Sequence, residues 1–165
     1  MGNAGKKTDS SDGGRYGRLH GTILESHDML SNRKEIHVEW GDCDPAGIVY
    51  YPRFFEYFDA CTNALFERAG FRKAEMLKSY GLLGIPMIDT RAQFYAPASF
   101  GETVRIETRI VEWGRSSFHV EHKLYNGEVL AAECAETRVW TVRDPQSKKG
   151  MRGQAIPEEI KARFA

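Results

Sequence analysis

The sequence has few cysteines, and none of them are paired at the spacing of a metal or redox motif. Cys43, Cys61 and Cys134 are far apart, odd in number and outside any C-x-x-C motif. This usage argues against a disulfide framework and against a zinc site, and it fits a reducing compartment. We therefore expect no metal and no organic cofactor.

Long hydrophobic runs are also missing. Nowhere do about eighteen apolar residues follow one another, and the first thirty residues lack the apolar run of a secretory signal. The opening "MGNAGK" resembles a myristoylation motif but carries Lys6 where Ser or Thr is needed. These features predict a soluble cytoplasmic protein that does not associate with membranes.

There is no excess of charge of either sign. Lys and Arg total 23 and Asp and Glu total 23, so the formal net charge is zero. No overall field draws the protein to nucleic acid or to an anionic membrane. We expect no nucleic-acid partner, and any anion site must be local.

What is present suits one globular domain. A chain of 165 residues with 41% hydrophobic residues can bury a single core. Residues 1–32 are rich in Gly, Ser, Asp and Lys, a composition that cannot bury enough surface to offset the entropy of ordering. We therefore expect a flexible tail over 1–32 and one domain over 33–165.

Hydrophobic periodicity predicts an α+β order of elements in that domain. In residues 33–41, Ile36, Val38 and Trp40 alternate with polar residues, as in a strand with one buried face. Pro52 opens a helix that ends near Gly70 and is apolar on several sides, which suits a buried central helix. A short helix at 72–81 and four strands at 85–97, 101–113, 116–126 and 128–144 follow, with a hairpin turn at Asn126-Gly127. A polar linker and a last helix behind Pro157 complete the chain.

The stretch "GDCDPAGIVYYPRFFEYFD", residues 41–59, combines acids with an apolar helix and admits several interpretations. "DCDPAG" is compatible with a simple turn. A calcium loop is excluded, because Ala46 and Arg53 occupy positions that need oxygen ligands. Cys43 is a poor nucleophile, since two flanking carboxylates disfavour its thiolate.

A further interpretation gives the acids a chemical role. Asp44 lies just before a helix N-terminus, where unpaired amides and the helix dipole favour developing negative charge. A carbonyl held at the amide near Tyr51 would be polarised, while Asp44 attacks its carbon or activates a water.

Residues 36–70 resemble the 4-hydroxybenzoyl-CoA thioesterase branch of the hotdog-fold thioesterases. "GDCDPAGIVYYPRFFEYFDA" carries most of the resemblance, and "GIPMIDTRAQFYAPASFGE" and "EWGRSSF" extend it over roughly Arg33 to Arg143. The resemblance implies an antiparallel sheet of five or six strands wrapped around a long central helix. It also implies a homo-oligomer, a dimer or a dimer of dimers such as a homotetramer, with active sites between subunits.

The resemblance also assigns residues. It implies that Asp44 is the catalytic carboxylate and that the Tyr51 amide polarises the carbonyl, with Gly47, Ile48 and Val49 of the loop beside the substrate. Asp59 falls where the family contacts the acyl ring hydroxyl; the alternative is that Asp59 faces solvent or pairs with Arg53 or Arg68. Only Arg115 remains of three basic residues used near the CoA phosphates, and Lys148, Lys149 and Arg152 are candidates to replace the others.

The resulting hypothesis is an acyl-CoA thioesterase that acts on a small aromatic, benzoyl-like or hydroxybenzoyl-like, substrate. Alternatives are a thioesterase for short aliphatic acyl groups, a hotdog dehydratase, and a non-catalytic module that binds acyl groups or joins assemblies. The dehydratase needs a His and acid pair, and no His occurs between residues 38 and 118.

Overall fold

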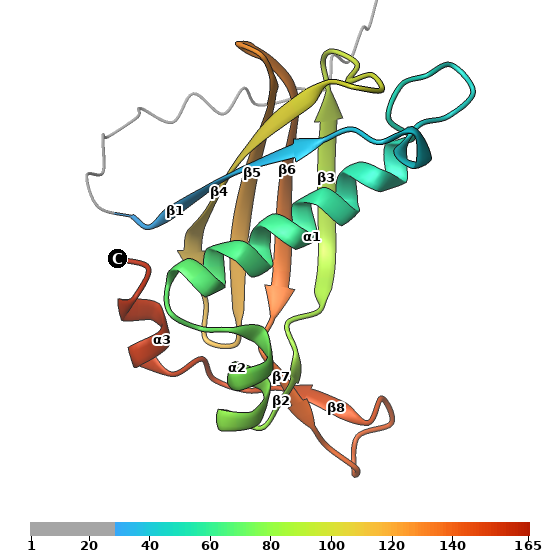
Figure 1. The fold of residues 1–165 in the computed structure, drawn as a ribbon. Coiled ribbons are helices and arrows are strands. Elements are labelled where there is room, and N and C mark those ends of the chain that lie inside the picture. Colours follow the sequence, from blue (N-terminus) through green and yellow to red (C-terminus); the bar gives the residue numbers. More distant parts are fainter. Residues whose placement is uncertain (1–28) are drawn as a thin grey trace, which may run out of the picture.

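A five-stranded antiparallel sheet forms the body of the protein, and the computed structural model describes residues 29–165. The strands lie in the order β1-β4-β5-β6-β3 (Figure 1). Their bounds are β1 Ser31–His37, β3 Met87–Phe94, β4 Thr103–Trp113, β5 Ser117–Asn126 and β6 Val129–Val139. β1 begins two residues before the expected domain start, and residues 1–28 of the expected tail lie outside the described residues.

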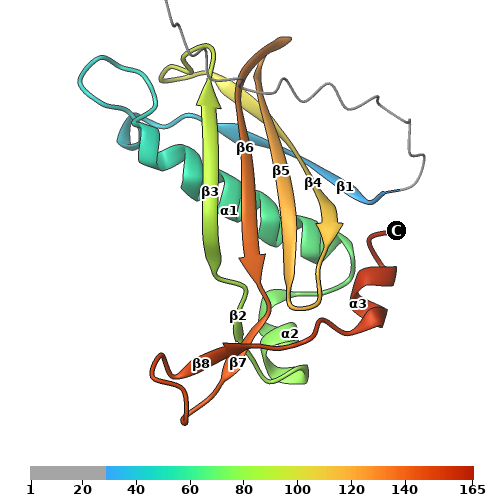
Figure 2. The same ribbon diagram turned by 180° about the vertical axis from the view of Figure 1, so that it is seen from behind.

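Helix α1, Tyr51–Arg68, crosses one face of this sheet, as Figures 1 and 2 show from opposite sides. Pro52 occupies its first turn, and Gly70 follows its end with a φ of 93°, a conformation that suits glycine. Its buried side chains recur at helical spacing and face the sheet: Phe54, Tyr57, Phe58, Cys61, Thr62, Leu65 and Phe66. The predicted central helix and the hotdog arrangement are therefore confirmed.

The meander after the helix follows the predicted order. β4 pairs with β5, and β5 pairs with β6, both antiparallel. Asn126 at the end of β5 pairs with Val129, so the turn is Gly127-Glu128, and Gly127 has a φ of 58°, as a tight hairpin requires. The predicted hairpin is confirmed, with its turn one residue later than Asn126-Gly127.

A second, small sheet departs from the predicted pattern. It has the order β2-β7-β8, with bounds β2 Leu82–Gly84, β7 Thr141–Arg143 and β8 Met151–Gly153. The strand expected over 128–144 is interrupted at Trp140, whose amide donates to Ser116 O at 2.8 Å and whose side chain is fully buried. The segment 145–154, expected to be a linker, therefore contains a strand.

Trp40 corrects another expectation. It was predicted on the buried face of the first strand, but β1 ends at His37 and a 3-10 turn, Trp40–Asp42, follows. Trp40 is 65% exposed, and its ring packs edge-on against Phe100. Val38, in contrast, is fully buried as expected.

The two remaining helices cover one end of the core. They are α2, Lys73–Ser79, and α3, Glu158–Ala162, and both fall where the sequence predicts them. Behind α3, the ring of Phe164 lies 4.9 Å from that of Phe66 and 5.3 Å from that of Trp113. Phe164 thus joins the C-terminal segment to α1 and to the sheet.

We expect Phe164→Ala to lower the free energy of unfolding by about 3–5 kcal/mol, because it leaves a cavity among buried aromatic rings. Chemical denaturation followed by circular dichroism measures the change. Val129→Ala, at a side chain that is 57% exposed, is the control and should change stability by at most about 0.5 kcal/mol. A loss no larger than that of the control would contradict the packing role of Phe164.

Candidate active site

The loop between β1 and α1 holds Asp44 in a tight turn. The Ala46 amide donates to Asp44 Oδ1 at 2.8 Å, and the Gly47 amide donates to Asp44 O at 2.9 Å. Gly47 has a φ of 76°, which this turn requires. One carboxylate oxygen is therefore fixed by the backbone, and Oδ2 accepts no hydrogen bond among the residues that the structure describes.

Gly47, Ile48 and Val49 form the return arm of the same loop. Ile48 O accepts from the Asp44 amide at 2.9 Å, and the Val49 amide donates to Ala98 O at 2.8 Å. Val49 is buried, whereas the Ile48 side chain is exposed. The amides of Gly47 and Val49 are thus used within the protein, and these two residues serve mainly to shape the loop.

The Tyr51 amide at the start of α1 is free of such internal partners. Pro52 has no amide hydrogen, and the Arg53 amide donates to Tyr50 O at 2.8 Å. Within residues 29–165, the Tyr51 amide makes no hydrogen bond. It can therefore donate to an external oxygen at the positive end of the helix dipole.

Asp42 stabilises this loop by a hydrogen bond and an ion pair. Its Oδ2 accepts from the Glu39 amide at 3.1 Å, and its Oδ1 lies 3.9 Å from Arg53 Nε in the first turn of α1. Desolvation and the carboxylates of Asp42 and Asp44 raise the pKa of the Cys43 thiol. This direction agrees with the expectation that Cys43 is not a nucleophile.

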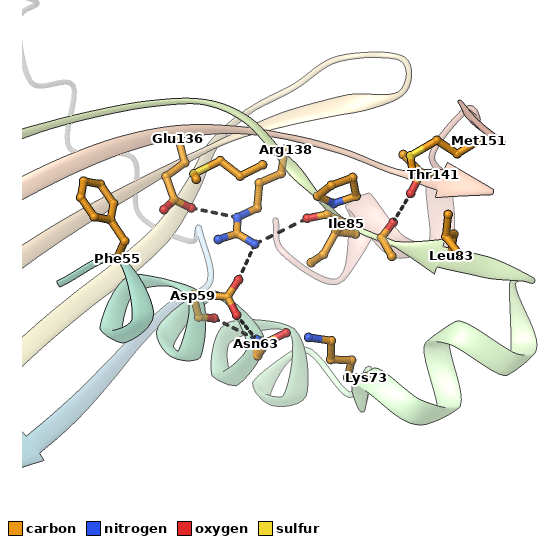
Figure 3. A pocket seen from close by; sticks show the side chains of 13 residues that line it. Phe55, Asp59, Asn63, Lys73, Leu83, Ile85, Glu136, Arg138, Thr141 and Met151 are labelled. Carbon is orange, nitrogen blue, oxygen red and sulfur yellow. Dashed lines mark hydrogen bonds and ion pairs between the residues drawn. The ribbon is translucent and has the colours of Figure 1, made fainter. Parts of the chain in front are cut away.

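A cavity of about 400 Å³ lies further along α1 (Figure 3). Phe55, Asp59 and Asn63 line it from the helix, and Glu136 and Arg138 line it from β6. Lys73 of α2, residues of β2, β3, β7 and β8, and the β2–β3 connection complete its wall. Asp59 is the one predicted site residue that lines the cavity; the others, Asp44, Gly47, Ile48, Val49, Tyr51 and Arg115, do not.

Asp59 is held in this cavity by an ion pair that the sequence did not suggest. Arg138 Nη1 donates to Asp59 Oδ1 at 2.8 Å, and Asn63 Nδ2 donates to Asp59 Oδ2 at 3.0 Å. The alternative partners were wrong: Arg53 pairs with Glu56, and Asp59 forms no ion pair with Arg68. The side chain of Asp59 remains 49% exposed.

Two buried polar residues, Glu136 and His122, extend this series of polar contacts beyond Arg138. Arg138 Nε donates to Glu136 Oε2 at 2.8 Å, and the same oxygen lies 3.6 Å from His122 Nε2. Burial lowers the pKa of His122, which is therefore neutral near pH 7. Burial alone would raise the pKa of Glu136, but the hydrogen bonds from His122 and Arg138 and the charge of Arg138 outweigh burial and lower it.

Sequence reasoning missed Glu136, Arg138 and His122, although a signal existed for each. Glu136 and Arg138 share a face of β6 with the buried Cys134, so the alternation of the strand places both ions toward the helix. His122 is likewise on the inner face of β5, while His119 is on the outer face beside Thr137. His119 and His122 therefore lie on opposite faces of the sheet.

Arg115 lies apart from both Asp44 and the cavity, in the turn between β4 and β5. Its side chain is exposed, and its carbonyl accepts from the Ile156 amide at 2.8 Å. Within residues 29–165, no cluster of His, Cys, Asp or Glu is arranged to hold a metal ion. The described helices also include none that is long and apolar enough to cross a membrane.

The sequence and the fold of this chain are similar to those of known thioesterases. The chain is 34% identical over 113 residues to 4-hydroxybenzoyl-CoA thioesterase of Pseudomonas sp. (strain CBS-3), which covers 65% of this chain and 80% of that protein. A mutant 4-hydroxybenzoyl-CoA thioesterase solved with 4-hydroxybenzoyl-CoA superposes with a TM-score of 0.76 at 28% identity, over 82% of this chain and 99% of the other.

A gentisyl-coenzyme A thioesterase also superposes, with a TM-score of 0.69 at 28% identity, over 81% of this chain and 98% of the other. The profile of the thioesterase-like superfamily matches residues 38–164, which include the Asp44 loop, α1 and all residues of the cavity. The chain therefore belongs to the thioesterase-like superfamily and has its hotdog fold.

Proposed function

We propose that this enzyme, an acyl-CoA thioesterase, acts on a small aromatic acyl group of the benzoyl or hydroxybenzoyl class. The observation that carries the proposal is the combination of a free Asp44 carboxylate oxygen in the loop before α1 with an unpaired Tyr51 amide at the start of α1. The two relatives described above that carry aromatic acyl-CoA names support the substrate class. Phe55 and Asp59 on the cavity wall suit a ring with a polar substituent.

The chemistry uses the thioester carbonyl. Its oxygen accepts from the Tyr51 amide, so that the negative charge developing on oxygen is stabilised by the helix N-terminus. Asp44 either attacks the carbon, which expels CoA thiolate and leaves an anhydride for water to hydrolyse, or takes a proton from an attacking water. Entry of labelled oxygen from water into Asp44 over many turnovers distinguishes the first route from the second.

We further propose that a second copy of the chain completes the site. The Asp44 loop lies at the start of α1, whereas the cavity with Asp59 lies beside the later turns and contains no loop residue. β3 is an edge strand whose sheet partner is β6 alone, so its outer edge can pair with a second copy. In such a dimer, or dimer of dimers, the loop of one protomer faces the cavity of its partner.

The CoA phosphates require cations outside the cavity. Arg115 is exposed, and the segment after β8 is bonded to its carbonyl. Gly153 in β8 also lies against the side chain of Ser116, next to Arg115. We propose that Arg115 acts with exposed cations of the β7–β8 hairpin, Lys148, Lys149 and Arg152, in binding the nucleotide phosphates.

Asp44→Asn should lower kcat by about two orders of magnitude or more, because the carboxylate supplies the nucleophile or the base. Thiol release from benzoyl-CoA, 4-hydroxybenzoyl-CoA, phenylacetyl-CoA and acetyl-CoA measures both the loss and the acyl preference. We expect the wild-type enzyme to favour the aromatic thioesters, and circular dichroism should show that the variant remains folded.

Asp42→Asn is the matched control, since it removes a carboxylate two residues away and keeps an oxygen that can accept from the Glu39 amide. It should change kcat less than about tenfold. Turnover of Asp44→Asn near the wild-type rate would refute the catalytic assignment. A faster rate with acetyl-CoA than with every aromatic thioester would refute the substrate class.

Ile88→Lys tests the second copy. Ile88 lies on the edge strand β3 with 66% of its surface exposed, and a charge there disfavours edge-to-edge pairing. We expect the variant to be monomeric in analytical ultracentrifugation and to lose most of its turnover. Val129→Lys, at an exposed residue by the β5–β6 turn that is not paired with β3, should keep both assembly and rate. An active monomer of Ile88→Lys would rule out a shared site.

A further inference from the structure

The guanidinium of Arg138 has three nitrogens, and two of them are fully used inside the protein. Nε donates to Glu136 at 2.8 Å. Nη1 donates to Asp59 at 2.8 Å and lies 3.5 Å from the carbonyl of Ile85. Nη2 makes no hydrogen bond to any described residue, and in Figure 3 it points toward the Phe55 side of the cavity. A charged donor is therefore directed into the cavity.

The position of this donor is fixed. The Arg138 side chain is only 5% exposed and lies between two carboxylates, so it has little freedom to turn away. Glu136 is itself held between Arg138 and His122, and Thr108 Oγ1 lies 2.9 Å from His122 Nδ1. A buried guanidinium bonded on two sides presents its remaining nitrogen in one direction.

An acceptor lies beside the donor. Each carboxylate oxygen of Asp59 has one described partner, Arg138 for Oδ1 and Asn63 for Oδ2, and an oxygen of this kind accepts more than one hydrogen bond. The cavity end thus offers a donor and an acceptor on adjacent side chains. A ligand group that matches both must donate and accept at once.

We propose that Arg138 is a specificity-determining residue, which donates from Nη2 to the acyl substituent while Asp59 accepts from the same substituent. The inference rests on the proposed function and narrows the substrate class to acyl rings that carry a hydroxyl at the far end. A hydroxyl oxygen both donates and accepts. An aromatic amine mainly donates and leaves the buried Arg138 donor without an acceptor, whereas a fluorine cannot donate and gives the Asp59 carboxylate no hydrogen bond.

The test compares four CoA thioesters whose benzoyl ring carries hydroxyl, amino, fluoro or hydrogen at the para position. For the wild-type enzyme we expect kcat/KM to be highest for hydroxyl, by about tenfold or more over amino and over fluoro. In Arg138→Met the advantage of hydroxyl over amino should disappear, because both groups then only donate to Asp59.

Two further variants control for stability and for general loss of charge. Glu136→Gln/Arg138→Met removes the carboxylate that Arg138→Met leaves unpaired, and it should show the same loss of preference. Arg109→Met breaks a pair of similar length, 2.9 Å to Glu121, on the outer face of the sheet. It should keep the wild-type preference.

The inference is overturned if the wild-type enzyme does not prefer hydroxyl over both amino and fluoro. It is also overturned if that preference survives in either folded Arg138 variant. Calorimetric binding of 4-hydroxybenzoate, 4-aminobenzoate and 4-fluorobenzoate to the same proteins gives a second measurement that needs no hydrolysis. If no thioester is hydrolysed, the proposed function fails, and this binding series alone confirms or refutes the role of Arg138.

Discussion

The packing of one face of α1 against the sheet is the constraint on which the site depends. Phe58, Leu65 and Phe66 are almost completely buried in this interface, so the helix cannot shift or rotate without exposing them. The same rigid element then carries the Tyr51 amide at its start and Asp59 in its middle. Hydrophobic burial of the helix therefore positions both the polar groups beside its buried face and the amide at its start.

The polar chain from Asp59 to His122 runs between helix and sheet, where isolated charges are expensive. It is tolerated because each ion is paired: Arg138 lies between Asp59 and Glu136, and the neutral His122 adds no charge. Replacing one member would leave an unpaired ion in a buried place. This explains how an arginine can be held rigidly in the wall of the cavity.

The sequence was informative wherever a local pattern determines the outcome. Pro52, Gly70 and the apolar spacing predicted α1, and Asn126-Gly127 predicted the hairpin. The loop motif predicted a turn before the helix. These features depend on residues close together in the chain, and their chemistry is visible in the letters alone.

Several features that depend on distant residues were not predicted. Asp59 and Arg138 are 79 residues apart, and their pairing requires the order of strands in the sheet. β8 is a strand only because β7 lies beside it, so its polar composition predicted a linker. Trp40 looked buried by alternation, but the chain leaves the strand before reaching it.

The central claim is that one carboxylate and one helix amide act on the same thioester carbonyl. A crystal structure with a thioether analogue of 4-hydroxybenzoyl-CoA, in which a methylene separates sulfur from the carbonyl, tests it most directly. We expect the carbonyl oxygen within hydrogen-bond distance of the Tyr51 amide and the carbonyl carbon beside the free oxygen of Asp44. A bound analogue whose carbonyl lies away from both groups would contradict the account.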